Sequence, residues 1–535
     1  MKTFFKTTIL AVLLTCVSLG ASAQIKTSYF MEGSTFRYDM NPALTPQRGY
    51  LKLPGLSMVG VDLSNTLLSL DRFLYNKNGE TVTFMHSSVT TEEFLKKLNK
   101  DNSLGFDVNV PLFGVADYGK RCFWSFDWNV RVMGGVNVPR DLFKLLKSFG
   151  SDVNLGNLRV DANAYSQAAL GFAFPIGKHV TFGFKVKGLW GLAHATVNFD
   201  DIGLSMNKDV ANLTAHGYVD ANIPGIVFNG IGKKGDKFNV DLGIGGDKDE
   251  KSTRESASAG SGEEGGNSID LKKLYTTTFN DIPGTIKNVK NGGVAFDLGV
   301  KVSLLKDHLR LSASVVDLGW IWWNKTNGAS VETSKIQMSF DGVNLSDMIN
   351  GKELDVNQVL THNLNELTVT NRGADGMVSR MATQFNVGVE YAFLRNHISV
   401  GLLSHNKFYE SHTYSELTAS LNFRPGKRFS ATFSHSFLNS GLSSMGFAIN
   451  VHGRGFNLFL GTDYIPFRFG TELKMEDMGF GIPIPTDTFG LSFHGGISFS
   501  LHEAHYGMTI KEARKARRAE KNAAKLAKIE RNKLK

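Results

Sequence analysis

Cysteine, proline and long apolar runs are all scarce in this chain of 535 residues, which has 2 Cys and 12 Pro. Only Cys122 lies beyond the first 23 residues, so a structural disulfide and a cysteine-based metal site are excluded there. No apolar run of about 18 residues follows that segment, which excludes a helical membrane anchor. With 56 Gly and 39 Phe, the composition favours strands joined by tight turns.

Positive charge is lacking over most of the chain, although the net charge is +9. The 25 residues from Lys511 carry 11 Lys or Arg and 3 Glu, a charge of +8, and Lys2 and Lys6 add two more. Residues 24–510 therefore carry −1, and no basic face supports nucleic-acid binding. Residues 503–535 are predicted to form a basic helical tail, which is either inert and solvated or binds an anionic periplasmic partner.

Residues 1–23 have the features of a signal peptide. Lys2 and Lys6 precede a mostly apolar stretch from Ile9 to Leu19, and Ala21-Ser22-Ala23 is a small-residue cleavage site. Cys16 is a weaker candidate for lipid attachment, because Thr15 fits a lipobox poorly. The sequence thus predicts export and a mature chain that begins at Gln24.

Alternation with a period of two is the main structural signal. From Cys122 to Val132, six apolar residues at even positions alternate with a mostly polar set that includes Asp127, Asn129 and Arg131. One face of such a strand needs an apolar environment. That environment is the core in a soluble β-sandwich and lipid in a membrane barrel, so one strand does not distinguish them.

The connections between strands distinguish these two folds. About 14 strands are expected, near 50–63, 103–117, 120–137, 160–174, 178–198, 291–305, 307–324, 379–394, 396–407, 412–424, 427–438, 443–452, 455–464 and 486–502. Tight turns follow strands 2, 4, 6, 8, 10 and 12, whereas the long links follow odd-numbered strands. Short turns at one end and long loops at the other are typical of outer-membrane barrels. The prediction is an all-β, antiparallel transmembrane β-barrel over residues 50–502, in outer-membrane lipid, with the soluble sandwich as the alternative.

Four long external loops are expected at 64–102, 138–159, 199–290 and 325–378. Residues 233–268 suggest a solvated loop tip, and a calcium loop around Gly243–Asp247 is a weaker alternative. Two loops carry amphipathic helical segments, one opened by the capping box from Thr90 to Glu93 and one with Pro139 at its first position. Their apolar stripes either pack on each other or line an apolar ligand-capture groove formed by Phe94, Leu95, Leu98, Leu142, Phe143, Leu146 and Phe149.

Catalytic motifs are absent from the sequence. It has no G-x-S-x-G, H-E-x-x-H or P-loop pattern, and His502-Glu503-Ala504-His505 has the wrong spacing for a zinc site. Neither an enzyme nor a cofactor is expected, and no metal site is assigned.

Asn41-Pro42-Ala43 near the mature N-terminus, ahead of about 14 strands, resembles the FadL-like superfamily of outer-membrane transporters. The stretch from Gly293 to Trp323 looks like an uncharacterised family of Bacteroides-type outer-membrane barrels within that group. The resemblance implies that residues 24–49 form a hatch inside the barrel, with Asn41, Pro42 and Ala43 in it. It also implies passive uptake of small hydrophobic molecules.

Polar residues on the predicted inner face are candidates to line the lumen, or else to form ion pairs between hatch and wall: Asp127, Asn129, Arg131, Lys185, Lys187, Asp297, Lys301, Glu390 and Glu416. The alternative function is a non-transporting adaptor barrel that docks secreted or periplasmic proteins. Long external loops and a basic tail would suit that role.

Overall fold

The computed structural model of the protein describes residues 25–503 and residue 522. The gaps are at 58, 66–69, 78–79, 148–152, 207–209, 223–226, 230–238, 242–290, 325–327, 342–368, 372–376, 427, 440, 454, 466–468, 476–479 and 486–490. The signal peptide, most of the 233–268 tip and nearly all of the basic tail therefore lie outside the described residues.

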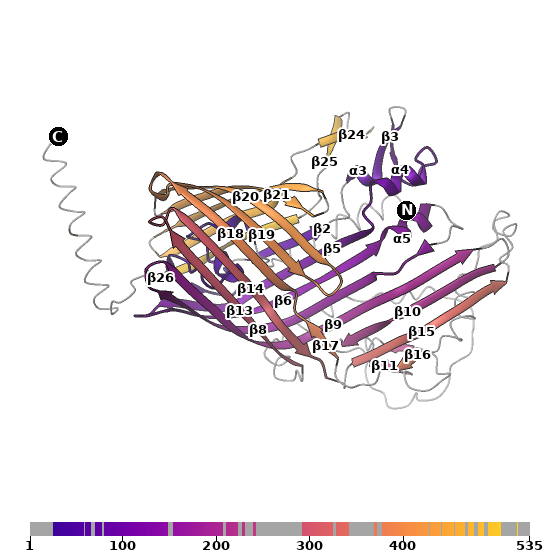
Figure 1. Ribbon diagram of the computed structural model, residues 1–535, viewed down its shortest axis with the longest axis horizontal. Helices are drawn as coiled ribbons and strands as arrows, with labels where there is room; N and C mark the ends of the chain where they lie inside the picture. The colour runs from indigo at the N-terminus through magenta and orange to yellow at the C-terminus, as the bar shows by residue number, and fades with distance from the viewer. Residues whose placement is uncertain are drawn as a thin grey trace.

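Fourteen strand positions close into one antiparallel barrel, the predicted fold (Figure 1). The first position is shared by β1 (Arg48–Lys52) and β2 (Val59–Asn65), which both pair with β26 and β5 and so close the ring. The ring continues as β5 (Asp101–Tyr118), β6 (Phe123–Pro139), β8 (Leu158–Ile176), β9 (Val180–Met206), β13 (Gly292–Leu304), β14 (Leu309–Trp322), β18 (Thr383–Phe393), β19 (Ile398–Phe408), β20 (Thr413–Gly426), β21 (Phe429–Leu438), β22 (Ser443–His452), β23 (Phe456–Ile465) and β26 (Leu491–Glu503).

The barrel is polar inside and apolar outside. On β21, Phe433 is 61% exposed on the outer face, whereas the neighbouring Thr432 and Ser434 are buried inside. On β6, Asp127, Asn129 and Arg131 point inward, as the alternation predicts. Because most strands repeat this pattern, apolar side chains cover most of the outer surface, as a lipid environment requires.

Tight turns join the strands at one end of the barrel, here called the short-turn end. The β13–β14 turn uses left-handed backbone at Lys306 and Asp307, and the β8–β9 turn does so at Gly177. These are turns that the sequence locates. The opposite end, the loop end, carries the long connections (Figure 1).

Two of the predicted loops contain strands that extend the wall at the loop end. β9 continues to Met206 and pairs there with β10 (Val210–Asn222), which pairs in turn with β15 (Gly328–Asp341). β16 (Val369–Asn371) adds to β15, and β17 (Val378–Arg380) adds to β14. The prediction of loops over 199–290 and 325–378 is therefore wrong for the end of β9 and for β10, β15 and β16, whose pairing depends on long-range register.

Small elements cover part of the loop end: α3 (Leu70–Phe73), β3 (Leu74–Lys77), β4 (Glu80–Thr83), α4 (Thr91–Lys96), α5 (Arg140–Lys147), β7 (Val153–Asn154), β11 (Val227–Asn229), β12 (Asn239–Asp241), β24 (Phe469–Met475) and β25 (Phe480–Pro485). Thr90 caps α4 by accepting a hydrogen bond from the Glu93 backbone N–H, as the capping box predicts. Pro139 ends β6, and α5 begins one residue later. No helix among the described residues is long and apolar enough to cross a membrane.

Candidate functional site: the closed lumen

The N-terminal segment, residues 25–47, lies inside the barrel and includes η1 (Lys26–Ser28) and α2 (Phe36–Met40) (Figure 1). The Tyr38 hydroxyl lies 3.0 Å from Ser125 Oγ on β6. The Thr27 hydroxyl lies 2.6 Å from Ser434 Oγ on β21, on the other side of the ring. The segment thus crosses the lumen, where the family resemblance places a hatch.

Asn41, Pro42 and Ala43 lie against the inner wall. Asn41 Oδ1 accepts a hydrogen bond from the Ala43 backbone N–H at 2.9 Å, and its Nδ2 donates to a β14 carbonyl at 3.2 Å. The wall residues opposite are Gly183 and Gly299, where an added Cβ would overlap the Pro42 carbonyl and the Asn41 amide. The missing side chains at these two positions let the motif approach the wall closely.

Lys26 anchors the start of the segment. Its ammonium lies 3.0 Å from the Tyr464 hydroxyl and within 3.4–3.6 Å of the carboxylates of Asp62, Glu416 and Asp463. Burial alone would lower the pKa of Lys26, but these carboxylates raise it well above its ordinary value. The charge therefore persists in the lumen and ties the segment to β2, β20 and β23.

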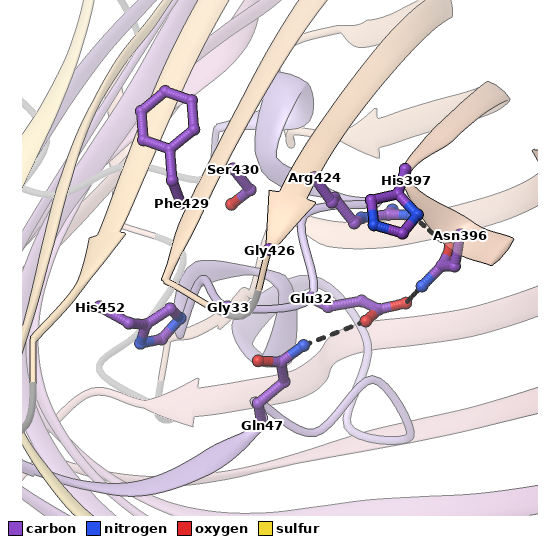
Figure 2. A pocket seen from close by; sticks show the side chains of 10 residues that line it. All are labelled: Glu32, Gly33, Gln47, Asn396, His397, Arg424, Gly426, Phe429, Ser430 and His452. Atoms are coloured by element: carbon purple, nitrogen blue, oxygen red, sulfur yellow. Dashed lines mark hydrogen bonds between the residues drawn. The ribbon is translucent and has the colours of Figure 1, made fainter. Parts of the chain in front are cut away.

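Glu32 anchors the segment at the short-turn end (Figure 2). Its carboxylate accepts hydrogen bonds from Arg310 at 2.5 Å, from Asn396 at 3.0 Å and from Gln47 at 3.1 Å. Burial would raise the pKa of Glu32, but Arg424 and the other nearby guanidinium groups lower it to about 2. A cavity of about 320 Å³, here called the rim pocket, lies beside this carboxylate between the segment and the turns of the barrel.

Six charged residues form a chain across the lumen, here called the ion belt: Lys407, Asp107, Arg131, Asp317, Lys187 and Asp297. The nitrogen–oxygen distances along this chain are 2.5–2.7 Å, and each member is at most 6% exposed. The three cations balance the three carboxylates, which reduces the cost of burying them.

The ion belt spans the full width of the barrel. Asp107 lies on β5 and Lys407 on β19, and these strands stand seven positions apart in the ring of 14. They are therefore diametrically opposite, yet their side chains meet at 2.5 Å. A solute that follows the barrel axis therefore meets this belt as well as the N-terminal segment.

All nine predicted lumen residues lie on inward positions. Eight are at most 6% exposed, and Lys301 is half-buried. Lys185 pairs with Asp39 of the N-terminal segment, and Glu416 pairs with Lys26, so these two join segment to wall. Asp127 pairs with Lys52, and Glu390 with Arg424 and Arg310. For the seven charged candidates other than Lys301, the geometry is that of the alternative in which they form structural ion pairs.

An apolar cluster fills the lumen between the ion belt and the loop end. This lumen cluster consists of Met133, Tyr165, Leu189, Ala295, Ile321, Trp323, Met381, Ala382, Tyr409, Tyr414 and Leu438, all from inner-wall or turn positions. The Trp323 indole donates a hydrogen bond to Ser379 at 2.8 Å, and its ring stacks on that of His194 at 5.1 Å. A barrel with a purely aqueous lumen has no need of such a cluster.

The helical stripes of the loop end pack on each other instead of lining an open groove. Phe94 is fully buried and Leu98 is 5% exposed, in a cluster with Tyr75 and Val89. Leu95 and Phe143 pack against that cluster, and Leu142 is half-buried. The Leu146 side chain and Phe149 lie outside the described residues. The prediction of an apolar groove is thus wrong for Phe94 and Leu98, because mutual burial of the stripes leaves them little accessible surface.

The mouth of the lumen holds a polar cavity of about 480 Å³, here called the mouth pocket. Side-chain amides, hydroxyls and a few charged groups line it, from the ends of β5, β6 and β8, from the β19–β20 turn and from Asn439 after β21. The sequence gives no sign of this pocket, because its walls come from five separate loop-end segments.

Sequence reasoning missed half of the ion belt. Alternation along β5 and β19 was sufficient to place Asp107 and Lys407 inside. Asp317 is different, because a bulge at Val316 and Asp317 turns two successive side chains inward, and Asp317 has a left-handed backbone with φ of 59°. A carboxylate at a position that simple alternation assigns to lipid was the available signal of that bulge.

Metal ligands do not gather in the part of the chain that the structure describes, where no group of three or more His, Cys, Asp or Glu residues could hold an ion.

Several solved structures are similar in layout to this chain. The P. putida toluene transporter TodX is 8% identical with a TM-score of 0.31, over 88% of this chain and 95% of that one. The Ralstonia pickettii toluene transporter TbuX is 9% identical with a TM-score of 0.33, over 90% of this chain and 93% of that one. A mutant Rh. blastica porin is 12% identical with a TM-score of 0.18, over 64% and 92%.

No curated protein matches the sequence. A family model matches residues 42–463, which is most of the chain and covers nearly the whole barrel wall. Its description is a family of unknown function, DUF5723, and the chain belongs to this family.

Proposed function

We propose that this protein is an outer-membrane channel for passive uptake of small hydrophobic molecules. The observation that carries the proposal is the combination of an apolar outer surface with a lumen that holds the lumen cluster and an N-terminal segment folded inside the barrel through non-covalent contacts. The outer surface fits lipid. The aromatic and Met side chains inside would accept an apolar solute, whereas a porin for polar solutes needs an open aqueous lumen.

Passage requires the N-terminal segment to move. Apart from its chain link to β1, the segment is held by ion pairs, hydrogen bonds and packing, with Lys26 and Glu32 as two of its anchors. Such contacts can break and re-form, whereas a strand of the wall cannot leave without opening the ring. We therefore expect the segment to act as a plug that shifts during uptake.

A reversible cross-link tests this mechanism. The hydroxyl oxygens of Thr27 and Ser434 are 2.6 Å apart, so cysteines at these positions are well placed for a disulfide between segment and β21. The double variant is made with Cys122→Ser, and uptake of a fluorescent hydrophobic probe is measured in intact cells. We expect uptake to stop in the oxidised protein and to return after reduction, with Cys122→Ser alone unaffected by either treatment.

Uptake that is equal in the oxidised and reduced forms would contradict the plug mechanism. No uptake above cells that lack the protein would contradict transport altogether.

Closure of the lumen by both segment and belt favours a second candidate, an adaptor barrel that never conducts. In that case the oxidised double variant would retain every stable partner that co-purifies with the wild-type protein.

A further inference from the structure

The β19–β20 turn, residues 409–412, folds inward across the mouth of the barrel. The Ser411 backbone N–H donates to Asp161 Oδ1 on β8 at 2.9 Å, and β8 stands five positions away from β19 in the ring. On β6, Gly135 makes room for the turn, because a Cβ there would meet Ser411 and His412 at 2.6 Å. The turn therefore roofs the lumen cluster, to which it contributes Tyr409.

The mouth pocket lies between this turn and the ends of β5, β6 and β8. Its charged groups are compensated or solvated: Arg159 pairs with Asp200 at 3.5 Å, Asp101 accepts from Asn137, and Lys100 is exposed beside Asp101. The remaining groups are mainly neutral amides and hydroxyls, which both donate and accept hydrogen bonds. This chemistry suits an uncharged ligand group rich in hydroxyls better than an anion or a cation.

The mouth pocket borders the lumen cluster at the β19–β20 turn. His412 lines the pocket, and its ring stacks on that of Tyr409, a member of the cluster, with 4.7 Å between centroids. A ligand held in the pocket by a polar head would thus have its apolar part directed at the cluster once the turn moves.

We infer that the mouth pocket binds the uncharged, hydroxyl-bearing head group of an amphipathic ligand. The inference rests on the proposed function, since it names the class of molecule that the channel admits. It also explains why an apolar lumen cluster lies beneath a polar entrance.

Ligand binding to the full-length protein in lipid nanodiscs tests the inference, with empty nanodiscs as background. The probes share an octyl chain and differ in the head: octyl glucoside, nonanoate and octyltrimethylammonium. We expect octyl glucoside to bind at least tenfold more tightly than either charged probe. Asn439→Leu combined with Thr413→Val should weaken its binding about tenfold, through loss of hydrogen bonds to the head.

Asn406→Leu is the matched control, because Asn406 lies near the loop end on the outer face of β19 and does not line the pocket. Its affinity for octyl glucoside should equal that of the wild type. Equal or tighter binding of a charged probe, or unchanged affinity in the double variant, would overturn the inference.

The cross-linked Thr27/Ser434 form separates this inference from the proposed function. It should bind octyl glucoside with unchanged affinity while uptake stops. Head-specific binding without any uptake would refute the channel and leave the pocket in place. Uptake of hydrocarbons without head-specific binding would refute the pocket and leave the channel in place.

Discussion

Removing one charge from the ion belt should destabilise the whole barrel. Asp317 is fully buried and accepts hydrogen bonds from Arg131 at 2.6 Å, Lys187 at 2.5 Å and Gln384 at 3.1 Å. Asp317→Asn keeps the size of the side chain and suits the left-handed backbone, since Asn tolerates that conformation. It leaves two buried cations short of a partner, a change that typically costs about 3–5 kcal/mol.

Asp307→Asn is the matched control for this substitution. Asp307 also has a left-handed backbone, with φ of 68°, but it is exposed in the β13–β14 turn. The free energy of unfolding is measured by urea titration of both variants in lipid vesicles. We expect a loss of about 3–5 kcal/mol for Asp317→Asn and less than about 0.5 kcal/mol for Asp307→Asn.

Restoring the charge balance should return part of the lost stability. In Asp317→Asn, Lys187 keeps Asp297 at 2.7 Å, whereas Arg131 and Lys407 share Asp107, so adding Lys407→Met leaves two complete ion pairs. The double variant should therefore be more stable than Asp317→Asn alone. If both Asp→Asn variants unfold within about 1 kcal/mol of the wild type, the belt does not hold the lumen together and the reasoning fails.

Three further predictions concern the outer face, the mouth turn and the tail. Phe433→Arg puts a charge on the apolar outer face and should cost about 2–4 kcal/mol at mid-membrane, with Phe433→Leu as control; equal folding yields would contradict a lipid-facing surface. Burial raises the pKa of Glu410 from 4.5 to about 7, and the nearby carboxylates of Asp161 and Asp220 also raise it, whereas Arg380 lowers it. Protonation thus favours the folded turn, so stability should be greatest below about pH 4.5, fall by at most ~3 kcal/mol as pH rises to 7 and stay flat above. Thermal unfolding should show this slope in the wild type and lose it in Glu410→Gln. We also propose that the tail binds an anionic periplasmic partner. Truncation after Ile510 should leave folding intact and remove a salt-sensitive co-sedimentation with cell wall or anionic liposomes, since exposed charges are screened beyond about 8 Å at physiological salt.

The strands and the orientation of their faces follow from local sequence. Period-two alternation assigns Asp127 to the inside and Trp128 to the outside of β6, because successive side chains of a strand point to opposite faces. Tight turns such as Lys306-Asp307 are equally local, since left-handed backbone and polar residues mark them. For this reason the 14 strand positions and the inward location of all nine lumen candidates could be predicted from the sequence.

Tertiary structure alone decided which of those inward residues meet. Lys407 touches Asp107 across the barrel because ring closure brings residues 300 positions apart in the chain to the same level of the lumen. Asp317 joins the belt through a bulge that reverses the alternation of β14, and the β19–β20 turn reaches Asp161 because Gly135 opposite it lacks a side chain. Local pattern determines the face on which a residue lies, whereas register, bulges and closure determine its partner, because these depend on contacts between distant strands.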